Sequence, residues 1–381
     1  MGEDATTRSI VWTETSRGDT PPLDDERRAW VGFNLVSGVG PVRTDHLLDR
    51  FGSLADAWEA ATGQLGRILD EATLRRLVAV RDSDEVGQTV ARMAATGIRA
   101  VIRTDPGYPA LLAEIPAPPP LLYVRGDLLP ADRQAVAIVG TRRMTAYGRD
   151  VTATIAAGLA RAGVTVVSGL ALGVDGIAHR AALDAGGRTL AVKGCGIAHP
   201  YPATHRGLAA DIVTSGALIA EYAPDRKPDA ANFPARNRII SGLSLGTVVI
   251  EAPERSGALI TVSFAADQGR DVFVVPGDVR SLASAGCNAL LREGARAVRS
   301  AEDVLEDLNL GGRAQATATQ TAFPLDDAER RVMTHLTREP QHIDEIAAVL
   351  GLPVHHLATQ LMMLELKGAV RNTGAQHYAS T

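Results

Sequence analysis

The chain has few cysteines, few aromatic residues and no long apolar run. Cys195 and Cys287 are the only cysteines among 381 residues, which is too few for a disulfide framework and fits a reducing compartment. No apolar run approaches the roughly 18 residues that a membrane-spanning helix needs. The first residues also lack the basic and then apolar pattern of a signal peptide. We therefore expect a cytoplasmic protein that does not interact with a membrane.

Sequence hallmarks of several enzyme classes are also missing. There is neither a G-x-x-x-x-G-K-[ST] phosphate-binding loop nor a G-x-G-x-x-G dinucleotide fingerprint. Cys195 and His199 have C-x3-H spacing, but no second pair completes a tetrahedral metal site. His179 is interpreted as a packed or capping residue, with a role at a binding site as the alternative. We therefore expect a protein without metal or cofactor that is not an enzyme.

Positive charge is not in excess overall, because the net charge is −5. If this chain binds DNA, its positive charge must be gathered locally. The segment from Phe233 to Ser244 gathers it, placing one ring, Arg236, Asn237 and Arg238 within six residues. An exposed ring beside guanidinium groups offers a single-stranded nucleic acid a stacking face and charge for its backbone. The alternative is a helix start with ordinary surface arginines.

Buried strands alternate with helices from Ala135 onward. Continuous apolar strands separated by helices predict a Rossmann-like, doubly wound, mostly parallel sheet in an α/β protein. The helix after the first of these strands carries Val151, Ile155 and Leu159 at helical spacing and ends near Gly163. The predicted strands are Leu121–Val124, Ala135–Val139, Val164–Val167, Leu190–Val192, Ala217–Ala220, Thr247–Ile250 and Asp271–Val275.

Composition and periodicity divide the chain into five segments. Residues 1–25 are polar and without periodicity, which predicts a disordered arm. Residues 26–100 predict a small helical domain of the SAM or helix-hairpin-helix kind, in which Gly38-Val39-Gly40-Pro41 either packs or holds a phosphate. Residues 101–310 form the Rossmann-like domain, residues 311–323 a linker, and residues 324–381 a winged helix. The last predicted helix, Pro353–Lys367, is poor in arginine and contacts either a protein or DNA.

Small-residue loops follow the strands of the Rossmann-like domain. Ligands of open α/β sheets bind outside the carboxyl ends of the strands, so these loops predict one site. Gly140-Thr141-Arg142 precedes a helix start and suits a phosphate, although a tight turn with a surface arginine gives the same sequence. Lys193 reaches either a phosphate or only the apolar surface beneath its stem. The candidate site residues in these loops are Gly140, Thr141, Arg142, Ser168, Gly169, Lys193, Ser256 and Gly257.

Two carboxylates, Glu221 and Glu251, end strands at the same edge. They would repel a phosphate unless they pair with arginine, so we expect them to orient Arg236, Arg238 or Arg255. The side chains of Arg142 and Arg238 are expected to be exposed and to contribute little to the core.

Taken together, these segments resemble the DNA-processing protein A (DprA/Smf) family. The matching motifs occur in the family's order across residues 135–299. Tyr108-Pro109, the Leu122–Asp127 segment, the helical N-terminal domain and the winged-helix tail extend the resemblance over most of the chain. The motifs are Val136–Arg142, Val167–Asp175, Ala178-His179, Gly194–Gly196, Tyr201-Pro202, Phe233–Ser244, Glu251-Ala252, Ser256–Thr261 and Val275–Gly277.

The resemblance implies a non-enzymatic, dimeric protein that binds single-stranded DNA and helps load the RecA recombinase during natural transformation. Two positions depart from the family's usual pattern: Thr141 replaces serine, which preserves the hydroxyl, and Lys193 replaces an apolar residue. By motif, the pocket for the strand would consist of Gly140, Thr141, Arg142, Ser168, Gly169, Phe233, Arg236, Asn237 and Arg238.

Two other functions compete with this interpretation. The Rossmann-like superfamily includes cytokinin-activating phosphoribohydrolases, which hydrolyse nucleoside monophosphates and which Gly246-Thr247 resembles. In that motif the Gly-Thr pair opens a helix and a glutamate follows three residues later, whereas here it is expected to open a strand and the third position is Ile250. A nucleotide-binding sensor module is the other alternative.

Overall fold

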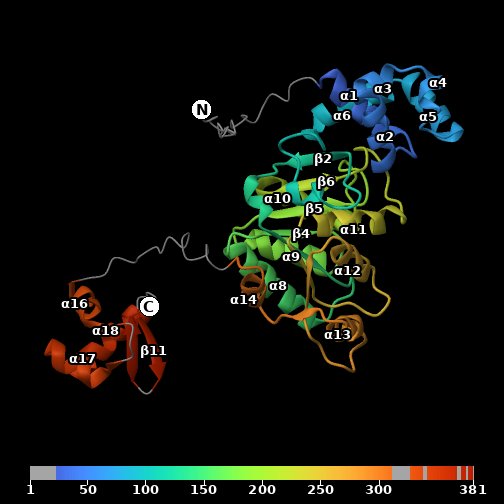
Figure 1. The fold of residues 1–381 in the computed structure, drawn as a ribbon. Helices are drawn as coiled ribbons and strands as arrows, with labels where there is room; N and C mark the ends of the chain where they lie inside the picture. Colours follow the sequence, from blue (N-terminus) through green and yellow to red (C-terminus); the bar gives the residue numbers. More distant parts are fainter. Residues whose placement is uncertain (1–22, 311–326, 338–340, 367–369, 375, 381) are drawn as a thin grey trace, which may run out of the picture. The chain divides into compact units, whose positions relative to one another are not determined.

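The computed structural model describes residues 23–310, 327–337, 341–366, 370–374 and 376–380 (Figure 1). The chain divides into two compact units, residues 1–312 and 313–381, which are considered separately. The predicted arm, except for its last three residues, and the predicted linker lie outside the described residues.

Within the described residues of the first unit, six helices precede the sheet. Three of them have side-chain N-caps, because Asp24, Ser53 and Asp70 each accept a hydrogen bond from a backbone amide of the first turn. Trp30 and Phe33 on the first helix are buried in the core that these helices share. The predicted helices are therefore present, and their core continues into the sheet through Leu121 and Tyr123. Its helices are α1 (Asp25–Leu35), α2 (Pro41–Phe51), α3 (Leu54–Glu59), α4 (Thr62–Leu65), α5 (Glu71–Arg81) and α6 (Glu85–Thr96).

The glycine-rich turn between α1 and α2 is held by arginines of its own domain. Arg43 donates to the carbonyl of Gly38 at 2.7 Å, and Arg76 donates to the carbonyl of Ser37 at 2.8 Å. Gly38 has a φ of +104°, which favours glycine at this position. These contacts give the turn a packing role.

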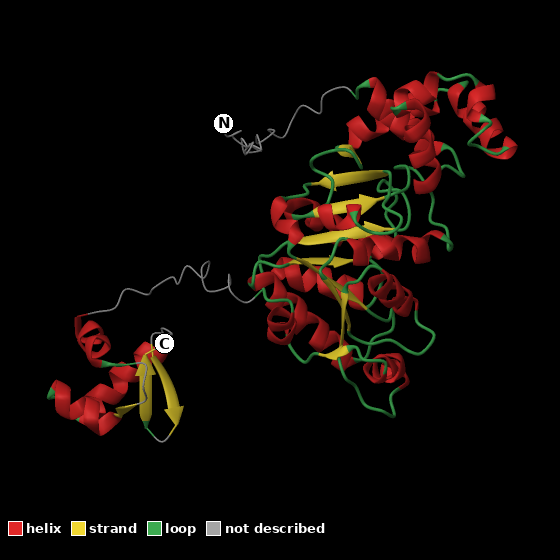
Figure 2. Ribbon diagram, in the orientation of Figure 1, coloured by secondary structure: helices red, strands yellow, loops and turns green. Residues whose placement is uncertain are grey.

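A nine-stranded, mostly parallel sheet forms the centre of the unit (Figure 2). Its strand order is β1-β2-β6-β5-β4-β3-β7-β8-β9, and only the β1–β2 and β2–β6 pairs are antiparallel. After β6 the chain returns to the far side of β3 to form β7, so the loops after β3 and β7 diverge at a topological switch point. The strands are β1 (Ile98–Ile102), β2 (Leu121–Gly126), β3 (Ala135–Val139), β4 (Thr165–Ser168), β5 (Thr189–Lys193), β6 (Ala217–Ala220), β7 (Gly246–Val249), β8 (Asp271–Val274) and β9 (Arg296–Ala297).

Helices cover both faces of this sheet. Val136 and Ile138 of β3 face one core layer, while Ala135, Ala137 and Val139 face the other, as the alternation of a strand requires. The first layer is completed by α8 (Ala146–Arg161), α9 (Val174–Asp184) and α14 (Ala301–Asp307). The second is completed by α7 (Ala110–Ala113), α11 (Asn232–Gly242), α12 (Gly257–Asp267) and α13 (Ala285–Arg292), while α10 (Arg206–Ser215) packs beside α9.

Charged side chains lie at both edge strands of the sheet. At β1, Arg27 of α1 donates to the carbonyl of Ala100, and Asp105 accepts from the amide of Ile102. Arg27 and Asp105 also form a bidentate ion pair with 2.7 Å contacts. At the other edge, Arg296 of β9 pairs with Asp271 and Asp307. Because β1 belongs to the sheet, the expected domain boundary at residue 100 falls inside a strand.

The second unit has the three helices and the strand pair predicted for a winged helix. A short additional strand, β10, pairs with β12 in the three-stranded sheet β10-β12-β11. Among the described residues, no single helix is long and apolar enough to cross a membrane; Ile343–Leu350 and Val354–Glu365 meet that test by length and composition only as a pair bent by 110°. The elements are α16 (Asp327–His335), β10 (Gln341–His342), α17 (Ile343–Leu350), α18 (Val354–Leu366), β11 (Val370–Gly374) and β12 (His377–Ser380).

Candidate nucleic-acid interface

A cleft of about 790 Å³ opens at the switch point of the sheet, and we call it the switch-point cleft. The loop after β3, the loop between β7 and α12, and the first turns of α11 line it. This position follows from the topology, because the loops after β3 and β7 diverge there and leave a crevice. Eight of the twelve predicted site residues line the cleft: Gly140, Thr141, Arg142, Phe233, Arg236, Asn237, Ser256 and Gly257.

An aromatic and cationic surface forms one wall of the cleft. The ring centroids of Phe233 and Tyr201 lie 5.4 Å apart with the rings tilted by 39°, a separation typical of interacting rings. The guanidinium carbon of Arg142 lies 5.9 Å from the centroid of Phe233. Tyr201 is 41% exposed, so its ring is available to a ligand. Sequence reasoning did not select Tyr201 as a site residue, since it comes from a loop 32 positions before Phe233.

Three arginines on the rim have no carboxylate partner in the part of the chain that the structure describes. Arg142, Arg143 and Arg255 are exposed and line the cleft, and none forms an ion pair with another described residue. Asn237 joins two sides of the cleft by donating to the carbonyl of Gly257 at 3.2 Å. The sequence motif did not single out Arg143 as a binding residue and gave Arg255 only as a partner for a carboxylate. The rim therefore gathers positive charge on a chain whose net charge is −5.

Arg236 lies at the base of the cleft, and it is only 4% exposed. Asp175, at the start of α9, lies near it, and its carboxylate accepts a hydrogen bond from the amide of Ala171. Burial raises the pKa of Asp175, while Arg236 opposes that rise. Burial also lowers the pKa of Arg236, and Asp175 opposes that shift. Gly169 is required between them, because a Cβ atom there would overlap the Arg236 guanidinium and lie 2.7 Å from the Asp175 carboxylate.

The remaining predicted site residues do not face the switch-point cleft. The hydroxyl of Ser168 is buried and donates to the carbonyl of Ile138. Lys193 is 4% exposed and donates to the carbonyls of Ile197 and His199, and burial lowers its pKa. Gly169 and Lys193 line a smaller cavity, which shares Phe233, Tyr201 and Arg236 with the cleft.

Arg238 differs most from the expectation of an exposed arginine. Its side chain is 13% exposed and forms an ion pair with Glu221 at 2.5 Å, and it does not line the cleft. This pair confirms the expected partner for Glu221. The expectation for Glu251 was wrong: it accepts from the amide and hydroxyl of Thr145, at 2.8 and 2.6 Å, and so stabilises the start of α8.

Residues that resemble catalytic groups are buried in structural roles. His179 is fully buried and bonded to Thr189 at 2.6 Å, as expected for a packed histidine. Ser244 falls in a G-x-S-x-G pattern, but it is buried between α11 and β7 and donates to the carbonyl of Ile240. Gly246-Thr247 opens a strand rather than a helix, as expected. Within the described ranges, no group of three or more His, Cys, Asp or Glu residues could hold a metal ion.

These features define an α/β protein in which a Rossmann-like sheet carries an arginine-rimmed cleft and is followed by a winged helix. Residues 99–309 match the family model "DNA recombination-mediator protein A", and residues 316–375 match the "DprA winged helix domain" model. The chain therefore belongs to the DNA-processing protein A (DprA/Smf) family.

Relatives and solved structures agree with this assignment. Protein Smf of Synechocystis is 33% identical, covering 93% of this chain and 99% of the relative, and the putative DNA processing protein DprA of Mycobacterium tuberculosis is 38% identical, covering 91% and 92%. The X-ray structure of DprA from Streptococcus pneumoniae matches with a TM-score of 0.64 and 33% identity, covering 74% of this chain and 97% of that one. A Helicobacter pylori DprA structure, described for its single-stranded DNA binding mode, matches with a TM-score of 0.51 and 31% identity, covering 56% and 95%.

Proposed function

We propose that this protein binds single-stranded DNA in the switch-point cleft. The observation that carries the proposal is the exposed Arg142 guanidinium placed over the ring of Phe233, with Tyr201 beside it. Bases stack on such rings when they are not held in a duplex, and a stacking face accepts every base. The family assignment and the Helicobacter pylori relative support this ligand.

The phosphates of the strand bind at the rim of the cleft. Arg142, Arg143 and Arg255, none of which forms an ion pair with another described residue, provide the charge. Arg236 acts from below, where its burial strengthens its interaction with an approaching anion. Affinity then arises from stacking and backbone charge rather than from base-edge recognition, so sequence preference is low.

In the cell, the bound strand is a substrate for recombination rather than for chemistry on the DNA. We infer that the protein acts as a homodimer in DNA processing during natural transformation and helps load the RecA recombinase onto the strand. The support is the resemblance across most of the chain. The packed positions of His179 and Ser244 support a binding protein rather than an enzyme.

A titration with single-stranded and blunt duplex oligonucleotides at several salt concentrations tests the binding proposal. Single strands are expected to bind more tightly, and log affinity is expected to fall with log salt by about 0.7 for each phosphate neutralised. Phe233→Leu and Tyr201→Leu are expected to weaken binding by about 1–3 kcal/mol each through lost stacking. Tyr147→Leu, which removes an exposed ring outside the cleft, is the matched control. Equal affinity for both DNA forms contradicts the proposal.

RecA loading has a separate test. RecA-catalysed strand exchange on DNA coated with a single-strand-binding protein is expected to speed up when this protein is added. The Phe233→Leu variant is expected to give little acceleration. Tight DNA binding without any effect on RecA would contradict the loading role and leave the binding role intact.

A further inference from the structure

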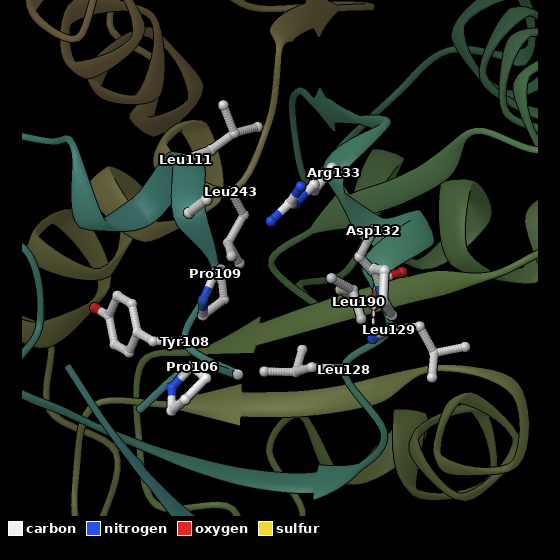
Figure 3. A pocket seen from close by; sticks show the side chains of 13 residues that line it. Pro106, Tyr108, Pro109, Leu111, Leu128, Leu129, Asp132, Arg133, Leu190 and Leu243 are labelled. Atoms are coloured by element: carbon white, nitrogen blue, oxygen red, sulfur yellow. Dashed lines mark hydrogen bonds between the residues drawn. The ribbon is translucent and has the colours of Figure 1, made fainter. Parts of the chain in front are cut away.

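A separate pocket lies at the opposite end of the strands from the switch-point cleft. It has a volume of about 130 Å³ and includes Leu190, near the start of β5, and Leu243, which follows α11. We call it the apolar pocket. Its walls come from two segments, residues 106–111 and residues 128–133, that flank β2 in the sequence (Figure 3).

The walls of the apolar pocket are mainly leucine and proline side chains. Leu190 and Leu243 are buried at its base, while Leu111 and Leu128 are partly exposed at its sides. A cavity of this size is close to one that accepts a benzene molecule. The pocket therefore has room for one ring or one branched aliphatic group.

Charge at the pocket is positive by one unit. The carboxylate of Asp132 is neutralised by Arg188 through two contacts of 3.0 and 2.9 Å, and it also accepts from the amide of Leu129 at 2.7 Å. Arg133 is exposed and has no ion-pair or hydrogen-bond partner among the described residues. Figure 3 shows its guanidinium end directed across the pocket towards Leu243. One unpaired cation thus lies over an apolar base.

We propose that the apolar pocket binds a small carboxylate whose apolar part is about the size of a benzene ring. The apolar group would replace water against Leu190 and Leu243, and the carboxylate would accept from Arg133, which offers a planar pair of donors. The same chemistry occurs in a free organic acid and in the C-terminal residue of a peptide. This site is independent of the DNA site, since none of its lining residues lines the switch-point cleft.

Two probes and a neutral analogue test the proposal on the full-length protein. Phenylacetate represents a free acid, N-acetyl-leucine represents a chain end, and phenylacetamide has the shape of phenylacetate without its charge. Ligand-observed NMR detects binding, and titration gives the dissociation constants. We expect phenylacetate to bind about tenfold more tightly than phenylacetamide, the ratio of one charge-assisted hydrogen bond. Tighter binding of N-acetyl-leucine than of phenylacetate would identify a chain end as the source of the carboxylate.

Three variants separate the contribution of the Arg133 charge to binding from that of the cavity. Arg133→Gln is expected to remove the preference for the acid, so that acid and amide bind alike. Gly107→Leu is expected to weaken the binding of both probes, because Gly107 lines the pocket and a leucine side chain would take up space there. The fold should tolerate the change, because a Cβ atom at residue 107 meets no heavy atom within 4 Å. Arg149→Gln, an exposed arginine elsewhere on the unit, should change neither. Equal binding of acid and amide to the parent protein, no binding of either acid, or an acid preference that survives Arg133→Gln would overturn the proposal.

Discussion

Arg142 lies over the ring of Phe233, with 5.9 Å between its guanidinium carbon and the ring centroid, although the two residues are 91 positions apart in the sequence. Arg142 comes from the loop after β3 and Phe233 from the start of α11. Their meeting places a cation and a stacking surface on the same wall of the switch-point cleft. A single nucleotide can therefore be contacted through its phosphate and its base at once.

Replacing Arg142 with alanine is expected to lower affinity for single-stranded DNA without unfolding the protein. A charge-assisted hydrogen bond to a phosphate contributes about 1.5–3 kcal/mol, and the exposed side chain contributes little to the core. Fluorescence anisotropy at several salt concentrations should also show a slope reduced by about 0.7. Arg149→Ala, which removes an exposed arginine outside the cleft, is the control. An unchanged slope would mean that Arg142 does not contact the backbone.

Gly169→Ala is expected to weaken DNA binding through the displacement of Arg236. A Cβ atom at residue 169 would overlap the Arg236 guanidinium, and both positions are buried. We expect a loss of about tenfold in affinity, comparable to one charge-assisted hydrogen bond. Gly207→Ala is the control, because Gly207 does not line the cleft and a Cβ atom there meets nothing within 4 Å. Similar affinities of the two variants would show that the position of Arg236 is unimportant.

Arg238→Ala is expected to act on stability rather than directly on DNA. Its ion pair with Glu221 is mostly buried, so removing the guanidinium leaves a poorly solvated carboxylate and costs about 1–3 kcal/mol. Urea unfolding of Arg238→Ala, Glu221→Gln and the double variant measures this. The double variant should be less destabilised than the sum of the single variants. Additive effects would indicate that the two side chains do not interact in solution.

His179 is expected to make stability depend on pH below its ordinary pKa. Burial lowers the pKa of His179 to about 3, from its ordinary value of 6.5. Between these values the unfolded chain binds a proton that the folded protein does not. The free energy of unfolding should therefore fall as pH drops below 6.5, by up to about 1.4 kcal/mol per pH unit from this residue. His179→Phe should reduce the slope of unfolding free energy against pH between 4 and 6.5. Parallel slopes for parent and His179→Phe would refute this assignment.

A protein ending at Leu310 is expected to keep most of its affinity for single-stranded DNA. The residues of the switch-point cleft lie between Val139 and Thr261, and the compact first unit extends to residue 312. Binding by the shortened chain is compared with that of the full chain, with circular dichroism to verify its fold. Loss of most affinity in a folded, shortened protein would place the main binding surface in the winged-helix unit.

Strands β3 to β8 could be predicted to within one residue, and two of them, β3 and β6, have the predicted bounds, whereas the two-residue parallel strand β9 was missed. Buried parallel strands are continuous apolar runs, which is a strong local signal. The antiparallel strand β1 was missed, because an edge strand of five residues between helices carries a much weaker pattern. The same limit explains why β10, which has only two residues, was not predicted.

The loops of the site could be predicted because loops at the carboxyl edge of a parallel sheet converge. The sequence could not predict which arginine of α11 faces the cleft. Arg236, Ile239 and Ile240 share the buried stripe of that helix, while Arg238 turns towards Glu221. That rotation is set by the packing of α11 against β5 and α12, which no local pattern contains. Tyr201 joins the site from a distant loop for the same reason.

The charged contacts at β1 and β9 also restrict how two copies of this protein can associate. An exposed sheet edge is a template for adding a strand from another chain. Here Arg27 donates a hydrogen bond to the carbonyl of Ala100, and Asp105 accepts one from the amide of Ile102, so neither group is free to pair with another strand. The opposite edge is two residues long and carries Arg296 with its acidic partners. A continuous sheet across two subunits is therefore disfavoured, and a homodimer of this unit would join through helix and loop surfaces.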